Sequence, residues 1–142
     1  MMSNDRPLKV FLVDDDVKTL IMLKSQLSKK IDHDIDINIF VYGENSLDRM
    51  DKNPDIVVLD YYLDGIKEDA ENGLEILKKI KAISPNTQII MLSSQEDMET
   101  ALEAIRAGAY DYIIKGEKGI DRLILTLNRL ILDYKKQLKE VF

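Results

Sequence analysis

The sequence predicts an α/β fold with a doubly wound, five-stranded parallel sheet, and three observations support this prediction. Short apolar runs alternate along the chain with segments in which apolar residues recur at helical spacing. Most of these runs are apolar throughout, which is typical of parallel strands covered by helices on both faces. Aspartate, serine or lysine stands at the ends of four of the runs. Open α/β sheets bind their ligands beyond that edge.

The first half of the chain supplies three of the expected strands. The run 9–13 (KVFLV) stops at three aspartates, and the helical spacing of 17–31 begins directly after them. Residues 35–42 alternate and then become apolar, as a strand does, and 45–50 fits a short helix. The run 54–60 (PDIVVLD) is a third strand that ends at an aspartate.

The second half continues the same alternation. Residues 72–83 carry apolar side chains at helical spacing, and 88–92 (QIIML) is a buried run that ends at two serines. Residues 95–107 are expected to form a helix, and 110–114 a strand that ends at a lysine. A long helix is expected over 120–142. Right-handed crossovers then place helices on both faces of one sheet.

Composition narrows the function classes. The chain has 142 residues, which fits a single domain over residues 1–142. It contains no cysteine and one histidine, so disulfides, thiolate sites and multi-histidine zinc sites are excluded. The net charge of −6 disfavours direct nucleic-acid binding. The sequence shows neither a membrane span nor a signal peptide, so we expect a cytoplasmic protein that does not bind membranes.

The strand ends carry the chemistry. Asp14, Asp15, Asp60, Ser93 and Lys115 would all lie at one edge of the sheet. Carboxylates this close repel one another unless a cation lies among them, and an oxygen-only site suits Mg²⁺. A hydroxyl and an ammonium group can bind the other oxygens of a phosphoryl group, and a carboxylate can form an acyl phosphate. Each residue taken alone is more simply a helix cap or a solvated side chain; the convergence of all five favours a site.

Four motifs at these positions resemble the receiver domains of two-component response regulators, the CheY-like family: FLVDDD, IVVLDYYLDG, IIMLSS and GAYDYIIKG. The similarity spans about residues 8–135. It implies the strand order 2-1-3-4-5 and a signalling domain rather than an enzyme. Such a domain accepts a phosphoryl group from a sensor histidine kinase or a phosphotransfer protein, and phosphorylation switches a partner-binding surface. It also implies Mg²⁺-dependent self-phosphorylation and self-dephosphorylation.

The resemblance assigns roles to the acidic residues and their neighbours. Asp60 matches the phosphoacceptor and a metal ligand. Asp14 and Asp15 match the acidic pair that holds Mg²⁺, with Asp15 as the direct ligand. Tyr62 matches the position whose backbone carbonyl binds the metal, and Lys115 matches the family's lysine.

Four further positions match the family's switch and access residues. Ser93 corresponds to the switch hydroxyl, and Tyr112 to the aromatic residue that responds to it. Ser94 corresponds to the small residue that guards access to the phosphoryl group. Gln95, like Tyr62, matches a position beside the approach of the hydrolytic water.

The chain departs from the family pattern at three places. Gly116 follows Lys115 where the family usually has a proline in a cis bond, so a looser turn is expected there. Asp64 stands where proline is common. The segment 65–71 adds an acidic insertion beside the site. None of these departures removes a residue that phosphoryl transfer needs.

Three alternatives compete with a phosphorylated receiver. A phosphatase of the haloacid-dehalogenase type needs D-x-D-x-T/V, but in the motif that would begin at Asp14, Lys18 occupies the fifth place. A flavodoxin-like cofactor binder needs a hydroxyl-rich phosphate loop, and the acidic loop after the first strand would repel a phosphate. A degenerate receiver that only binds proteins would not need the complete set of acidic, hydroxyl and lysine residues.

The last helix carries a candidate contact surface. Leu125 and Leu132 lie seven residues apart (132 − 125), opposite the apolar arc that should pack on the sheet. Two isolated exposed leucines are common on monomers. Their shared stripe, beside the helix over 95–107 and the strand over 110–114, marks a candidate homodimer face, which receivers commonly use.

Overall fold

The computed structural model describes residues 6–63 and 72–141, and side chains as far as residue 137. The five strands form one parallel sheet in the order β2-β1-β3-β4-β5, so the predicted fold and strand order are confirmed. The strands are β1 (Leu8–Val13), β2 (Ile35–Phe40), β3 (Ile56–Asp60), β4 (Gln88–Ser93) and β5 (Asp111–Ile114). The helices are α1 (Val17–Lys30), α2 (Gly43–Leu47), the 3-10 turn η1 (Met50–Lys52), α3 (Gly73–Ile83), α4 (Met98–Arg106) and α5 (Glu117–Val141).

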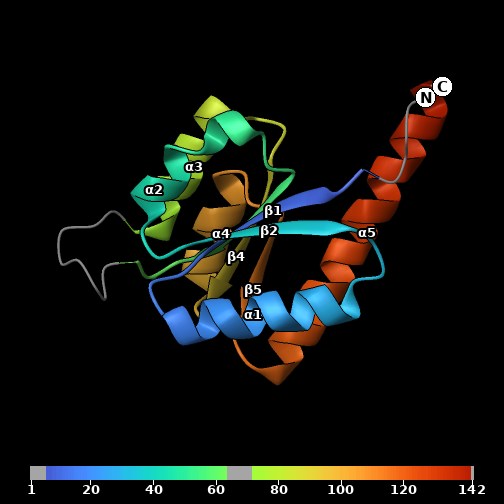
Figure 1. The fold of residues 1–142 in the computed structure, drawn as a ribbon. Coiled ribbons are helices and arrows are strands. Elements are labelled where there is room, and N and C mark those ends of the chain that lie inside the picture. The colour runs from blue at the N-terminus through green and yellow to red at the C-terminus, as the bar shows by residue number, and fades with distance from the viewer. Residues whose placement is uncertain (1–5, 64–71, 142) are drawn as a thin grey trace.

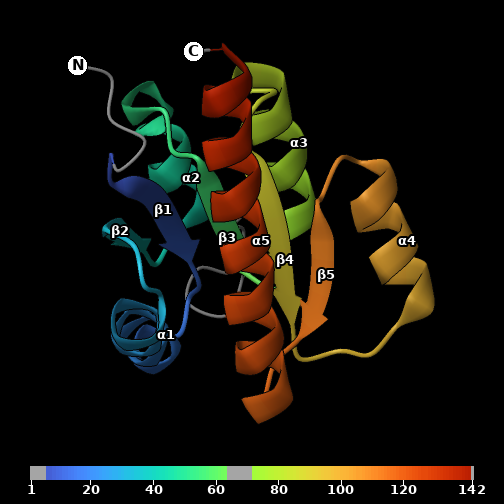
Figure 2. The ribbon, with the colours of Figure 1, turned by 90° about the vertical axis from the view of Figure 1, so that its right-hand side faces the viewer.

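Helices cover both faces of the sheet (Figure 1), and an apolar layer lies between the sheet and the helices on each face. On one face, side chains of α1 and α5 such as Leu20 and Leu127 pack against β1, β3 and β4. On the other face, Phe11 of β1 lies in a cluster with Ile76 of α3 and Ala104 of α4. Figure 2 shows α5 crossing the sheet and running on past the strands. Every residue of β3 is buried because both layers cover this central strand.

Three helices begin or end elsewhere than the sequence predicts. We expected a helix from residue 95, but α4 begins at Met98, because the carboxylate of Asp97 caps it by accepting from the Glu99 N–H at 3.1 Å. The long helix begins at Glu117 instead of residue 120. The helix expected over 45–50 is divided into α2 and η1. Side-chain caps and short turns do not depend on apolar periodicity, so that pattern misses them.

Asp16 has the capping role that its position suggests. Its carboxylate accepts from the Lys18 N–H at 3.1 Å and from the Thr19 hydroxyl at 3.0 Å, at the start of α1. Asp16 therefore caps α1, and the preceding two aspartates remain available at the edge of the sheet.

Among the described residues, no helix has the length and apolar character that crossing a bilayer requires.

Candidate functional site

Three carboxylates gather where β1 and β3 end. Asp14 and Asp15 follow β1, Asp60 ends β3, and one oxygen atom from each lies within 4.8 Å of the other two. Asp14 and Asp60 are buried, with exposed fractions of 2% and 4%, and Asp15 is half-buried. A buried group of oxygen donors at this spacing can hold a metal ion.

The side chain of Lys115 joins two of these carboxylates. Its Nζ lies 2.9 Å from Asp14 Oδ2 and 3.3 Å from Asp60 Oδ1. Its backbone N–H donates to the Ser93 carbonyl at 2.8 Å, which fixes the end of β5 beside β4. Burial opposes the charge of Lys115, but the hydrogen bond to Asp14 and the charge of Asp60 outweigh burial and raise the pKa of Lys115. These two carboxylates therefore favour the protonated form of Lys115.

Asp14 is held by both carboxylate oxygens. Oδ2 pairs with Lys115, and Oδ1 accepts from the backbone N–H of Asp16 at 2.9 Å. The Asp14 N–H donates to the Phe40 carbonyl at 3.0 Å, which continues the pairing of β1 with β2 by one residue. Because its backbone N–H and both carboxylate oxygens are engaged, the position of this carboxylate is set by the strand and the following helix start.

Asp60 is far less well satisfied. Burial raises the pKa of Asp60 to about 7, the negative charge of Asp14 adds to the rise, and Lys115 counteracts part of it. The backbone N–H of Tyr62 lies 3.4 Å from Asp60 Oδ1, a long hydrogen bond. One lysine therefore does not compensate the negative charge of two buried carboxylates. Additional positive charge at this edge would favour the ionised form of Asp60.

A chain of hydrogen bonds links Ser93 to Tyr112. The backbone N–H of Gln95 donates to Ser93 Oγ at 3.1 Å, and the Tyr112 hydroxyl donates to the Gln95 carbonyl at 3.0 Å. Burial raises the pKa of the Tyr112 phenol, and its contact with the Ser93 hydroxyl offsets part of the rise. Ser93 is fully buried, and its own hydroxyl proton is not used in the bond with Gln95. The two predicted switch residues therefore touch the same loop.

The remaining predicted residues lie around this group. Tyr62 is 41% exposed and makes an edge-to-face ring contact with Tyr61 at 4.9 Å between ring centroids. Ser94 and Gln95 are exposed just beyond β4. The predictions that Tyr62 offers its carbonyl to a metal, and that Tyr62, Ser94 and Gln95 control access, stay predictions.

Two glycines shape the loops around the site. Gly116 has φ 135°, a backbone conformation that favours glycine. An added Cβ would have no atom within 4 Å, so steric crowding is not the reason for glycine here. The expectation of a looser turn at Gly116 stays a prediction. A Cβ on Gly73 would lie 2.3 Å from the Asp60 carbonyl oxygen, and Gly73 N–H donates to the Tyr61 carbonyl at 2.7 Å.

Gly73 packs against the backbone of Asp60, and no motif in the sequence predicts this contact. The only available signal was a glycine at the first turn of a helix that follows a long polar loop. Asp64 and the acidic insertion over 65–71 lie outside the described residues.

Comparison with known proteins identifies the class. Residues 10–128 match the family model of the response regulator receiver domain, so the chain belongs to that family. It is 32% identical over 126 residues to the chemotaxis protein CheY of Listeria monocytogenes, covering 86% of this chain and 97% of that protein. Both findings confirm the resemblance, the receiver function and its place in two-component signalling.

Longer regulators and solved receivers give the same assignment. The regulatory protein LuxO of Vibrio cholerae is 31% identical over 121 residues, or 84% of this chain, but the match spans only 25% of LuxO. The crystal structure of the receiver domain of NtrX from Brucella abortus has a TM-score of 0.74 at 34% identity, covering 86% of this chain and 97% of that one. The BeF3-activated receiver domain of DrrB has a TM-score of 0.75 at 28% identity, covering 89% and 98%.

Proposed function

We propose that Asp60 accepts the phosphoryl group in this receiver. The observation that carries the proposal is the convergence of Asp60 with Asp14 and Lys115 at one buried sheet edge. A carboxylate oxygen of Asp60 attacks the phosphorus, and the bond from phosphorus to the donor breaks. With a sensor histidine kinase or phosphotransfer protein as donor, the leaving group is an imidazole, and with acetyl phosphate it is acetate.

Asp14, Asp15 and Asp60, with the backbone carbonyl of Tyr62, would hold Mg²⁺. Bound Mg²⁺ offsets the repulsion between the carboxylates and an incoming phosphate, and it orients the phosphate oxygens. Lys115 binds one phosphoryl oxygen after leaving Asp60, while its bond to Asp14 keeps the ammonium in place. The Ser93 hydroxyl donates its proton to another phosphoryl oxygen, in place of its contact with Tyr112.

Phosphorylation is communicated through the loop after β4. When Ser93 turns its hydroxyl toward the phosphoryl group, the Gln95 N–H must move with it or lose its 3.1 Å bond. Either change alters the Gln95 carbonyl that now accepts from Tyr112. Tyr112 then turns inward, so a local charge change reaches the surface of α4 and β5.

That surface is the proposed contact face of a phosphorylation-dependent homodimer. Leu125 and Leu132 of α5 are 53% and 66% exposed, as expected, and Met98 and Leu102 of α4 are exposed as well. Sedimentation velocity should show stronger association with acetyl phosphate, and weaker association in Leu125→Glu/Leu132→Glu. Ile83→Glu, an exposed position at the end of α3, is the matched control. Identical sedimentation of all three proteins would exclude this face.

Intact-mass measurement tests the phosphoacceptor. With acetyl phosphate and Mg²⁺, the wild type should gain one phosphoryl group, and Asp60→Asn should gain none. Asp55→Asn makes the same change just before the same strand, outside the site, and should be phosphorylated like the wild type. Phosphorylation of Asp60→Asn at the wild-type rate would overturn the assignment, and dependence on Asp55 would point to a folding effect.

A further inference from the structure

The outer edge of β2 carries backbone groups that the sheet does not use. In the β1–β2 pair, Leu8 N–H donates to the Asp34 carbonyl at 2.8 Å and Asp14 N–H to the Phe40 carbonyl at 3.0 Å. Alternate residues of a parallel strand direct both N–H and C=O to the same neighbour. The even-numbered residues of β2 therefore pair with β1. The odd-numbered ones direct their N–H and C=O groups away from the sheet: Ile35, Ile37 and Ile39.

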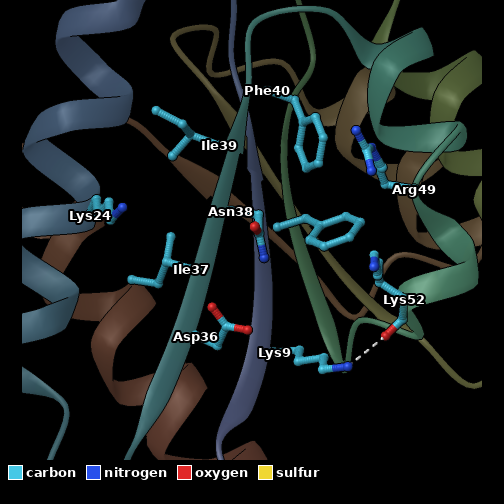
Figure 3. Close-up of a pocket in the computed structure, with 10 residues that line it drawn as sticks. Lys9, Lys24, Asp36, Ile37, Asn38, Ile39, Phe40, Arg49 and Lys52 are labelled. Atoms are coloured by element: carbon cyan, nitrogen blue, oxygen red, sulfur yellow. Dashed lines mark hydrogen bonds between the residues drawn. The ribbon is translucent and has the colours of Figure 1, made fainter.

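A hollow of about 690 Å³ follows this edge and carries positive charge (Figure 3). Its lining contains four cationic side chains and one carboxylate: Lys9, Lys24, Arg49, Lys52 and Asp36. The chain as a whole has a net charge of −6, so this positive surface contrasts with the rest of the protein. Lys9 Nζ donates to the Lys52 carbonyl at 3.0 Å, which fixes one cation against η1.

The two sides of the edge differ in character. Figure 3 shows Ile37 and Ile39 on the side toward α1, where Ile39 is 41% exposed. On the other side, Figure 3 shows Phe40 near Arg49, with Lys52 farther along the edge beside Lys9. Successive side chains of a strand added along β2 would face these sides in turn. The side toward α1 suits apolar side chains and has one cation, Lys24, in its lining. The other side suits acidic side chains, because three cations there (Lys9, Arg49 and Lys52) outnumber the carboxylate of Asp36.

We propose that the free edge of β2 binds an extended acidic segment of a partner protein, in which acidic and apolar residues alternate. The backbone of the segment would pair with Ile35, Ile37 and Ile39, as in other cases of strand addition to a sheet edge. Its carboxylates would meet Arg49 and Lys52. A second copy of this chain fits less well, because the same cations would then face one another across the contact.

A second hollow limits where the segment runs. It adjoins the first at Phe40 and Arg49 and is lined by Asp48 and Asp51. These carboxylates would repel an acidic segment. The segment is therefore confined to the length of β2, which six residues form. This binding does not depend on phosphorylation of Asp60.

Titration of the ¹⁵N-labelled chain with synthetic peptides tests the proposal. The probe is an end-blocked octapeptide of alternating glutamate and valine. The comparison peptide has the same composition, with the four glutamates placed first. We expect the alternating peptide to bind about tenfold more tightly and to shift the amide signals of β2. Equal affinity for both peptides would reduce the effect to net charge and overturn strand addition, as would the absence of binding.

Two charge variants and one proline variant locate the contact. Arg49→Ala/Lys52→Ala should weaken the alternating peptide about five- to tenfold, since each exposed charge pair contributes modestly. Lys118→Ala/Arg129→Ala removes the same charge from exposed positions on α5 and should leave affinity unchanged. Ile39→Pro removes one outward N–H at an edge position that tolerates proline, and should weaken binding further. Equal weakening by both charge variants, or wild-type affinity in a folded Ile39→Pro, would overturn the proposal.

Discussion

Strand β3 has one aspartate just before it and another at its carboxyl end. The two carboxylates differ strongly in their hydrogen bonds and in the charges around them. Asp55, just before the strand, accepts from Arg6 at 2.7 and 3.0 Å and from the Lys9 N–H at 2.9 Å. Asp60, at the other end, has Lys115 at 3.3 Å, a long bond from Tyr62, and the repulsion of Asp14. The first carboxylate is satisfied and the second is not.

The two edges of the sheet around β3 differ in the same way as the two aspartates. At the amino edge of the sheet, the Tyr134 hydroxyl donates to the Asp55 carbonyl at 3.2 Å, and the Thr87 hydroxyl donates to the Pro54 carbonyl at 2.9 Å. These bonds connect α5 and the start of β4 to β3. The amino edge thus stabilises the fold, whereas the carboxyl edge keeps an unfavourable charge that a ligand can relieve, a common property of functional sites.

The largest expected effect is an opposite change in stability at the two ends. Asp55→Asn should lower the free energy of unfolding by about 1–2 kcal/mol, because a charge-assisted pair is lost. Asp60→Asn should raise it by about 4 kcal/mol in metal-free protein at pH 8, because a buried repulsive charge is removed. Urea unfolding of both variants measures the difference. Destabilisation of similar size in both would remove the contrast.

The gap between Asp60→Asn and the wild type should depend on pH. The pKa of Asp60 is about 7 in the folded protein, against about 3.9 in an unfolded chain. Because the folded state binds the proton more tightly, the wild type loses stability as pH rises from about 4 to about 7. The gap should therefore grow from near zero at pH 4 to about 4 kcal/mol above pH 7. Metal-free urea titrations at several pH values test this, and a constant gap would contradict it.

Mg²⁺ should reduce the loss of stability that the buried negative charge of Asp60 causes. At tenfold excess over its dissociation constant, Mg²⁺ stabilises a folded protein by about 1.4 kcal/mol. Thermal unfolding at pH 8 should show this increase for the wild type and for Asp55→Asn. Asp15→Asn should lose most of it, since one of the three clustered carboxylates is gone. If Asp15→Asn responds as the wild type does, the metal lies elsewhere.

The smallest expected effect concerns the link to the surface. Tyr112→Phe removes the hydroxyl that donates to the Gln95 carbonyl, and it should lower the free energy of unfolding by about 0.5–1 kcal/mol. Amide signals of Ser93 and Gln95 should move toward their positions in the phosphorylated wild type. Tyr110→Phe, a nearby exposed tyrosine, is the control. Unchanged signals in Tyr112→Phe would separate Tyr112 from the switch loop.

The two edges also differ in how far the sequence predicts them. The convergence of Asp14, Asp60 and Lys115 could be predicted because parallel strands bring their carboxyl ends to one edge. The bonds of Arg6 and Tyr134 with Asp55 could not, because they join single polar residues 49 and 79 positions apart without a motif. Side-chain orientation was equally inaccessible, since apolar periodicity does not say where an exposed polar group finds its partner.

The hydrogen bond between Gly73 and Tyr61 has a consequence for variation among relatives. Leu63 is fully buried on one side of the β3–α3 connection, and Gly73 is bonded to the backbone beside Asp60 on the other. With both ends anchored in this way, a doubling of the loop between them costs only about 0.6 kcal/mol in closure entropy. The segment between these two anchors can therefore gain or lose residues at little cost in stability, while the carboxyl edge of the sheet stays in register.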